Sequence, residues 1–169
     1  DKRYLVENRL RPVAAKHGVP VLVDAAESLG ATHLDRAAGT MGHAGIYSFN
    51  GNKIMTTSGG GMLVSDDEEL VGKARFWSTQ SREPLPWYEH EEIGYNYRMS
   101  NLLAALGRAQ LERLDAMIDR RRQIRAHYDD VFSEVEGVSI LGRGTDAEDN
   151  FWLTAILVDP EVTGWSASD

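Results

Sequence analysis

The chain has 169 residues, and its 18 Lys and Arg against 26 Asp and Glu give a formal net charge of −8. Hydrophobic residues make up 42% and charged residues 26%, a balance typical of a soluble globular domain and unlike that of a disordered chain. An acidic chain is poorly suited to a nucleic acid or an anionic membrane as its main partner, so we expect neither. The absence of cysteine excludes disulfides, thiolate metal ligands and thiol nucleophiles.

The ends of the sequence indicate a piece of a longer protein. The chain begins at Asp1 without a methionine and stops at Asp169, shortly after a strand-like segment. No signal peptide pattern opens it, and no apolar run approaches the ~18 residues that span a bilayer.

The first quarter of the chain predicts a helix, a strand and a second helix. Apolar residues recur at helical spacing over residues 2–16, with Pro12 as an interruption. Residues 20–24 form an apolar run that ends in a carboxylate, which is typical of a strand buried on both faces of a parallel sheet. We expect residues 25–29 to begin another short helix.

Two further strands and two helices follow in the pattern. Residues 46–49 and 62–64 are strand-like, and an Asn-Gly-Asn turn and a run of glycines lie between them. Ser65 or Asp66 would cap a helix that runs to Trp77. After a loop-like stretch, Ser100 would cap one long helix.

That long helix is predicted to run to Phe132, and its cluster of arginines is interpreted as a solvated face. A polar loop at residues 142–149 and a β-rich strand at residues 151–158 complete the pattern. Alternating helices and strands favour an α/β sheet with helices on its faces. Such sheets bind ligands at the carboxyl ends of their strands.

Polar side chains with chemical potential gather at those strand ends. Asp24 is either a cap for the segment after it or a counter-ion for a cationic ligand group. Lys53 is either an exposed lysine or an amine that attacks an aldehyde from a partly dry site. The hydroxyls of Ser48, Thr56 and Thr57, with the nearby glycines, suit a bound phosphate.

Other kinds of site fit the sequence less well. The nucleotide-binding pattern G-x-x-x-x-G-K-[ST] is absent, since Lys53 follows Asn52 and precedes Ile54. The histidines show no zinc-binding spacing, and nothing singles out a pair of carboxylates for glycoside hydrolysis. Pyridoxal-phosphate chemistry uses a strand-end aspartate, a lysine and a phosphate-binding serine together, although spacing alone does not prove it.

Several motifs, in matching order, resemble the DegT-like sugar aminotransferases, which have fold type I. They are VDAAESLGA at residues 23–31, GTMG at 39–42, YSFNGNK at 47–53, TSGGG at 57–61, GYNYRMS at 94–100, and Gln110 with Leu111. The run ARFWSTQSRE at residues 74–83 is similar to the bacillosamine-pathway branch of that family.

The resemblance implies an α/β fold that forms part of the large domain of a pyridoxal-phosphate-dependent transferase. A mainly parallel sheet and a long helix would be followed by the start of a small α+β C-terminal domain. Residues 1–115 would then be the C-terminal part of the large domain, and residues 116–169 the linking helix and the incomplete small domain. Family members are more than twice as long, so we expect the full-length protein to be active and this chain alone to be inactive.

The resemblance also assigns roles to individual residues. Lys53 would be the catalytic lysine that bonds the cofactor and moves protons. Asp24 would pair with the pyridine nitrogen, and Ser48 would bind the phosphate. Asn96 would reach the phosphate in the neighbouring subunit of a homodimer. Glu27 stands where many relatives have glutamine near the 3-oxygen of the cofactor, and a carboxylate there needs a bonding partner.

By the same resemblance, the protein would be a cytoplasmic, homodimeric aminotransferase that uses pyridoxal 5'-phosphate and needs no metal. It would transfer an amino group from L-glutamate to a UDP-linked 4-keto-6-deoxy sugar for cell-surface polysaccharide synthesis. The alternatives are an inactive, truncated remnant that acts as a structural or association domain and, more remotely, a generic phosphate-binding α/β domain.

Overall fold

The computed structural model describes residues 9–142, 149–166 and 168. The first helix in this part of the chain, α2 (Arg11–Lys16), begins with Pro12 in its first turn. Proline is favoured there, because the first N–H groups of a helix have no partner within it. Pro12 therefore lies at the start of α2, directly after a π-helical turn at residues 9 and 10. The rest of the predicted helix, residues 1–8, lies outside the described residues.

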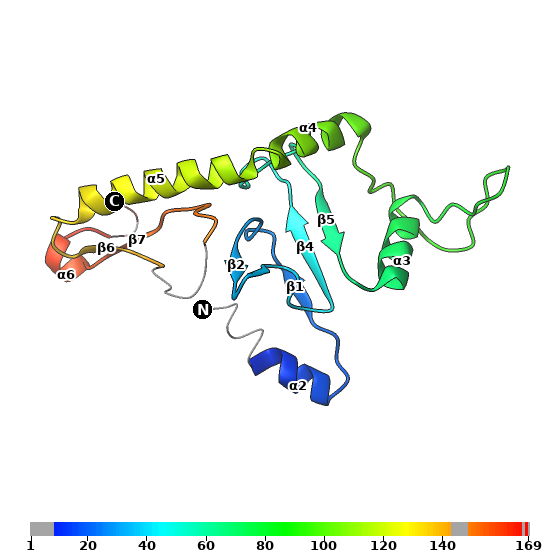
Figure 1. The fold of residues 1–169 in the computed structure, drawn as a ribbon, viewed down its shortest axis with the longest axis horizontal. Coiled ribbons are helices and arrows are strands. Elements are labelled where there is room, and N and C mark those ends of the chain that lie inside the picture. The colour runs from blue at the N-terminus through cyan, green and yellow to red at the C-terminus, as the bar shows by residue number, and fades with distance from the viewer. Residues whose placement is uncertain (1–8, 143–148, 167, 169) are drawn as a thin grey trace.

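The central sheet has three strands in the order β1-β4-β5 (Figure 1). Strand β1 (Leu22–Asp24) runs parallel to β4 (Ala44–Ser48), and β5 (Gly61–Val64) pairs antiparallel to β4. The expected α/β fold with a parallel pairing is thus confirmed. Helices α4 and α5 cross the end of the sheet toward which β4 points. Asp24 and Ser48, the last residues of β1 and β4, lie at this end.

The prediction that β1 is buried on both faces is wrong for the described chain. Leu22 is 66% exposed and Asp24 is also exposed. Within the described residues β1 pairs only with β4, so it is an edge strand with one unpaired side. Its apolar composition is still that of a buried strand.

Residues 25–29 form two consecutive turns, although a helix was predicted there. The Asp24 carboxylate accepts a hydrogen bond from Ala26 N at 3.0 Å, as a helix cap would. The N–H of Ser28 then bonds to Ala25 O, and that of Ala31 bonds to Ser28 O, both at 3.0 Å. The carbonyl groups of Glu27 and Leu29, which would accept hydrogen bonds in a continuing helix, accept from the side chain of Asn150 instead.

Close packing on β4 comes from the segment before it. The short hairpin of β2 (Thr32–His33) and β3 (Arg36–Ala37) leads into a turn that crosses β4. The hydroxyl of Tyr47 donates to Ala38 O, and burial raises the pKa of Tyr47. A Cβ atom added at Gly45 would lie 2.0 Å from Gly39 O, so glycine is required at this crossing.

Helix α3 (Glu68–Ser78) follows β5 and is capped by Asp67, whose carboxylate accepts from Leu70 N at 2.9 Å. The predicted helix is therefore present, with its cap one residue later than the nearer predicted position. Charge favours this start, because Glu68 and Glu69 lie at the positive end of the helix dipole.

The single long helix predicted from Ser100 to Phe132 is two helices. Ser100 caps α4 (Asn101–Leu111) as predicted, and α5 (Leu114–Phe132) starts three residues after α4 ends. Gly107 of α4 lies against Thr57. The helical hydrogen-bond pattern changes at Arg113, whose N–H donates to Gln110 O, three residues back, at 3.0 Å.

Helix α5 leads away from the sheet to a small C-terminal unit (Figure 1). There β6 (Val138–Ile140) pairs antiparallel with β7 (Ile156–Val158), and α6 (Pro160–Thr163) follows. Only the last three residues of the predicted strand 151–158 are a strand, and most of the predicted polar loop lies outside the described residues.

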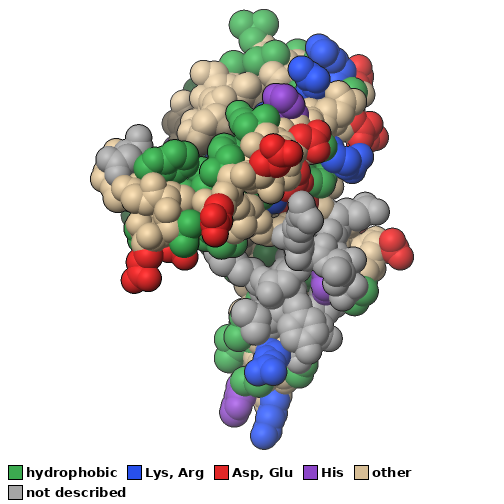
Figure 2. All heavy atoms as spheres, turned by 90° about the vertical axis from the view of Figure 1, so that its left-hand side faces the viewer, with side chains coloured by type: hydrophobic (Ala, Val, Ile, Leu, Met, Phe, Trp, Pro, Cys, Tyr) green, Lys and Arg blue, Asp and Glu red, His purple; other side chains and the backbone are tan. Residues whose placement is uncertain are grey.

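Large hydrophobic side chains are exposed at this end of the molecule. They include Leu141, Leu153, Ile156, Leu157, Val162 and Trp165. Figure 2 views the molecule from this end and shows hydrophobic side chains among charged side chains of both signs. The division at residues 115 and 116 stays a prediction. In the described ranges, no helix combines the length and hydrophobicity needed to cross a bilayer.

The main hydrophobic cluster lies at the carboxyl end of β4. Its buried members are Phe49, Ile54, Met55, Leu114 and Ile118. The first three come from the loop after β4, and the last two come from the start of α5. The core of the described chain therefore lies directly beside the turn that carries the predicted catalytic lysine.

We predict opposite effects for two Gly→Ala substitutions. In Gly45→Ala the new methyl group would collide with the backbone at Gly39, and the free energy of unfolding should fall by about 3 kcal/mol. Gly72→Ala lies within α3 with no atom within 4 Å of the new Cβ, and it should raise that free energy by about 0.5–1 kcal/mol. Urea denaturation measures both, and equal effects would contradict the packing described here.

Candidate active site

Two predicted site residues end neighbouring parallel strands. Asp24 is the last residue of β1 and Ser48 the last of β4. The register sets Asp24 beside Ile46, so both side chains belong to the same edge of the sheet. The Ser48 hydroxyl accepts a hydrogen bond from Asn50 N at 3.3 Å, which leaves its own proton available to a ligand.

Lys53 lies on a loop whose backbone is closed on itself. Phe49 N donates to Gly60 O at 2.9 Å, and Thr57 N donates to Phe49 O at 3.0 Å. Beside Lys53, the side chains of Ile54 and Met55 are buried in the core. The loop is therefore anchored to the core through Ile54 and Met55, whereas the side chain of Lys53 is not part of that core.

Helix α4 holds the same loop from the side. The side chain of Gln110 accepts a hydrogen bond from Thr56 N at 2.9 Å. One turn earlier, a Cβ atom at Gly107 would lie 2.8 Å from the Thr57 side chain, so the glycine allows the helix to approach closely. In the sequence Gln110 is part of a motif, and in the structure it anchors the loop that carries Lys53.

The amine of Lys53 has two neighbours. Its Nζ lies 3.3 Å from Glu27 Oε1 and 4.5 Å from the centroid of the Trp152 ring. The lysine side chain is only 13% exposed, whereas that of Glu27 is 61% exposed. Of the two interpretations of Lys53, the structure favours a partly buried lysine over an exposed one, with a carboxylate on one side and an aromatic face on the other.

The sequence did not reveal Asn150 and Trp152 as site residues. Asn150 is 3% exposed and its amide donates to Glu27 O and Leu29 O, both at 2.9 Å. The indole N–H of Trp152 donates to Asn52 O at 2.6 Å. These bonds explain why the predicted helix at residues 25–29 and the start of the predicted strand at 151–158 are both absent. The sequence contains one signal against a strand here. Phe151 and Trp152 are both apolar and adjacent, so this pair breaks the alternation of apolar and polar residues that a half-buried strand shows.

Four of the five predicted site residues form two pairs, and the fifth, Asn96, lies apart. Glu27 and Lys53 are in contact, and Asp24 and Ser48 share their edge of the sheet. Within the residues that the structure describes, no hydrogen bond links Asp24, Ser48 and Lys53 directly. Asn96 is exposed and lies elsewhere, bridged to Thr79 at the end of α3, where a segment that projects beyond α3 begins and ends (Figure 1).

We call this projecting segment, residues 79–97, the arm. Its two ends are joined by a bridge between Thr79 and Asn96, and Gln80 N donates to Tyr95 O at 3.0 Å. Its exposed side chains include Trp87, Tyr88, Ile93, Tyr95 and Tyr97. An ordered, aromatic segment of this kind is unusual for a surface that meets only water.

The sequence profile of the DegT/DnrJ/EryC1/StrS aminotransferase family matches residues 8–167. The chain belongs to this family. Its similarity to individual members is also extensive. The chain is 51% identical over 143 residues to Bacillus subtilis EpsN, which is named as a pyridoxal phosphate-dependent aminotransferase; the match covers 85% of this chain and 37% of EpsN.

Two further similar proteins are described with a nucleotide sugar. GDP-perosamine synthase of Caulobacter vibrioides is 41% identical over 117 residues, which cover 69% of this chain and 32% of that protein. The crystal structure of DesI in the presence of its TDP-sugar product superposes with a TM-score of 0.85 at 30% identity, and covers 96% of this chain and 41% of DesI. The chain thus spans roughly a third to two-fifths of these relatives.

The donor set fits the cofactor of this family. Pyridoxal phosphate carries an aldehyde, a pyridine nitrogen and a phosphate. Lys53 provides a partly buried amine, and Asp24 and Ser48, which end neighbouring strands, provide a carboxylate and a hydroxyl. Among the described residues, no group of three or more His, Asp or Glu side chains is placed to hold a metal ion.

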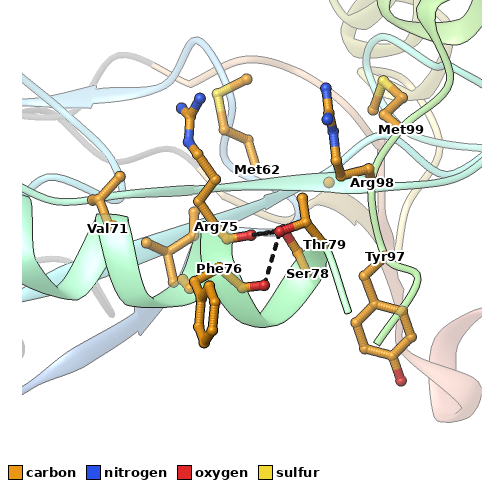
Figure 3. A pocket seen from close by; sticks show the side chains of 13 residues that line it. Met62, Val71, Arg75, Phe76, Ser78, Thr79, Tyr97, Arg98 and Met99 are labelled. Carbon is orange, nitrogen blue, oxygen red and sulfur yellow. Dashed lines mark hydrogen bonds between the residues drawn. The ribbon is translucent and has the colours of Figure 1, made fainter. Parts of the chain in front are cut away.

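A separate pocket lies on the far side of β5, away from these residues. It has a volume of about 640 Å³ and lies between β5, α3 and the segment Tyr97–Met99 (Figure 3). The guanidinium groups of Arg75 and Arg98 extend to the same side of it. None of Asp24, Ser48 and Lys53 lines this pocket, so it is not part of the candidate active site.

The arm is attached to α3 through Glu92. The Glu92 carboxylate pairs with Lys73, and it accepts a hydrogen bond from the indole of Trp77 at 2.9 Å. The hydrogen bond from Lys73 is the main cause that lowers the pKa of Glu92 below its ordinary value of 4.5, and the bond from Trp77 is the second. These contacts stabilise the arm when the carboxylate is ionised.

We predict that the arm loosens in acid. A lowered pKa in the folded state means that the stabilisation is present above pH 4.5 and is lost as the pH falls through the folded value. The indole N–H resonance of Trp77 should therefore shift in an NMR titration, with a midpoint below 4.5. In Glu92→Gln this shift should vanish, and a wild-type midpoint above 4.5 would contradict the assignment.

Proposed function

We propose that the whole protein is a pyridoxal-phosphate-dependent aminotransferase acting on a nucleotide-linked keto sugar. The observation that supports this most strongly is the Lys53 side chain, which is only 13% exposed on a loop anchored to the core. A lysine is seldom buried without a function. Membership of an aminotransferase family indicates that the Lys53 amine reacts with the aldehyde of the cofactor.

Each site residue would have a distinct task. Pyridoxal phosphate supplies an aldehyde for the substrate amine and a ring that accepts electrons. Lys53 would bond the aldehyde carbon at rest and carry protons at its amine during turnover. The Asp24 carboxylate would hold a proton on the pyridine nitrogen, and the Ser48 hydroxyl would donate to the phosphate.

The proposal extends to the kind of sugar and nucleotide that the whole protein uses. One relative is named as a GDP-perosamine synthase, and DesI is described with its TDP-sugar product. Both descriptions support a nucleotide sugar as the acceptor. We propose UDP-linked 4-keto-6-deoxy sugar from the resemblance of residues 74–83, L-glutamate as the donor, and the cytoplasm as the location. Because the chain spans 37% of EpsN, we also expect it to be inactive by itself.

Reduction with borohydride tests the role of Lys53. When the whole protein is incubated with pyridoxal phosphate and reduced, peptide mapping should find the pyridoxyl group on Lys53. The variant Lys53→Ala should carry none there and should lose activity by at least about 10³-fold, since covalent catalysis is lost. Lys16, which is exposed at the end of α2, serves as the control. Label on Lys16 but not on Lys53 would overturn the proposal.

We further propose that the arm completes the active site of a second subunit through Asn96. The exposed aromatic side chains of the arm and its projection from the body support this. A shared site of this kind explains why Asn96 lies apart from Asp24, Ser48 and Lys53.

Mixing two inactive variants tests the shared site. Lys53→Ala and Asn96→Ala should each be nearly inactive alone. After random reassembly, half of the dimers are mixed and hold one intact site, so roughly a quarter of the wild-type activity should return. If Lys53 and Asn96 act within one subunit, the mixture stays inactive.

A further inference from the structure

Trp152 contacts both the head group of Lys53 and the backbone beside it. The amine lies 4.5 Å from the ring centroid, within the range of about 6 Å in which an aromatic face attracts a cation. The indole N–H donates to Asn52 O, the residue before Lys53, at 2.6 Å. One half-buried side chain thus fixes the turn and covers the amine.

The segment around Trp152 is itself held in place. Phe151 adopts a φ of 53°, a conformation that a bulky residue rarely takes and that costs about 1 kcal/mol or more. Trp152 N donates to the side chain of Asn150 at 3.1 Å, and that side chain is buried against Glu27 O and Leu29 O. Such strain persists only where the surroundings enforce it, and here it directs the Trp152 ring toward Lys53.

Glu27 occupies the other side of the amine. Its carboxylate lies 3.3 Å from Nζ and is exposed to water on its outer side. A favourable ring face and a carboxylate together suit a lysine in its cationic form.

We propose that Trp152 and Glu27 form the resting place of the Lys53 amine whenever it is not bonded to the cofactor, and that Trp152 is a positioning residue. The proposal rests on the proposed function, in which the amine is released during turnover. A lysine has a long, flexible stem. Holding the free amine beside the sheet edge keeps its return an intramolecular step that needs no search.

Acetylation measures how well the amine is held. The whole protein, stripped of cofactor, is treated with trace acetic anhydride, and mass spectrometry gives the rate at each lysine. In Trp152→Leu, Lys53 should be acetylated at least about threefold faster, because the amine loses its aromatic cover. Trp152→Phe keeps a ring face without the indole N–H, and its rate should stay close to that of the wild type.

Two matched controls accompany this comparison. Lys73 has a similar environment, since it pairs with Glu92 and lies 5.3 Å from the centroids of both the Phe76 and the Trp77 rings. Its rate should not change in any Trp152 variant. Trp165→Leu removes a tryptophan from the surface of the C-terminal unit and should leave the Lys53 rate unchanged.

The outcomes separate the proposal from its alternatives. An unchanged Lys53 rate in Trp152→Leu overturns it, as does an equal increase in Trp152→Leu and Trp152→Phe, which would assign the effect to the Asn52 hydrogen bond. If Trp152→Leu unfolds and all lysines react faster, Glu27→Gln decides. Because Glu27 is mostly exposed, this variant should fold, and an unchanged Lys53 rate there also overturns the proposal.

Protection by the cofactor tests the proposed function separately. In the wild type, added pyridoxal phosphate should protect Lys53, but not Lys73, from acetylation. Failure of protection would count against the proposed function. Protection in the wild type together with an unchanged rate in Trp152→Leu would leave that function in place and refute only the role of Trp152.

Discussion

The site depends on one constraint, which is that the turn carrying Lys53 must be fixed while its amine stays accessible. The chain meets both needs with adjacent residues, because Ile54 and Met55 enter the core and Lys53 faces the edge of the sheet. Leu114 and Ile118 of α5 complete that core. The hydrophobic cluster that stabilises the described chain therefore also sets the position of the reactive group, and a core substitution there would move the amine as well as lower stability.

A second requirement is that distant parts of the chain meet at this turn. Asn150 donates to Glu27 O, a residue 123 positions away, and Trp152 donates to Asn52 O, 100 positions away. Each bond takes a backbone carbonyl that local structure leaves free. The segment 150–152 thus replaces local hydrogen bonds with long-range ones, and it joins the C-terminal unit to the active-site edge.

The sequence predicts those elements that depend on neighbouring residues, and it does not predict those that depend on contacts between distant residues. Ser100 was recognised as a cap, and residues 46–49 as a strand, because short sequences determine both. The turns at residues 25–29 depend on Asn150, a partner far along the chain, so local propensity does not predict them. The break between α4 and α5 falls at Glu112 and Arg113, where the sequence contains no glycine or proline to signal a stop. The roles of Lys53, Asp24 and Ser48 came from family resemblance, whereas Trp152 belongs to no quoted motif and emerges only when the chain is folded.

The pairing of Glu27 with Lys53 accounts for a carboxylate where many relatives carry glutamine. A carboxylate near the 3-oxygen of the cofactor would repel a phenolate unless it had a bonding partner, and the lysine cation is that partner when the amine is free. The strength of the pair decides whether it could trap the lysine. Pairs open to water contribute between 0 and about 1 kcal/mol, and Glu27 is 61% exposed. A bond to an aldehyde carbon outweighs that readily, so the pair can hold the amine without competing with the chemistry that we propose for it.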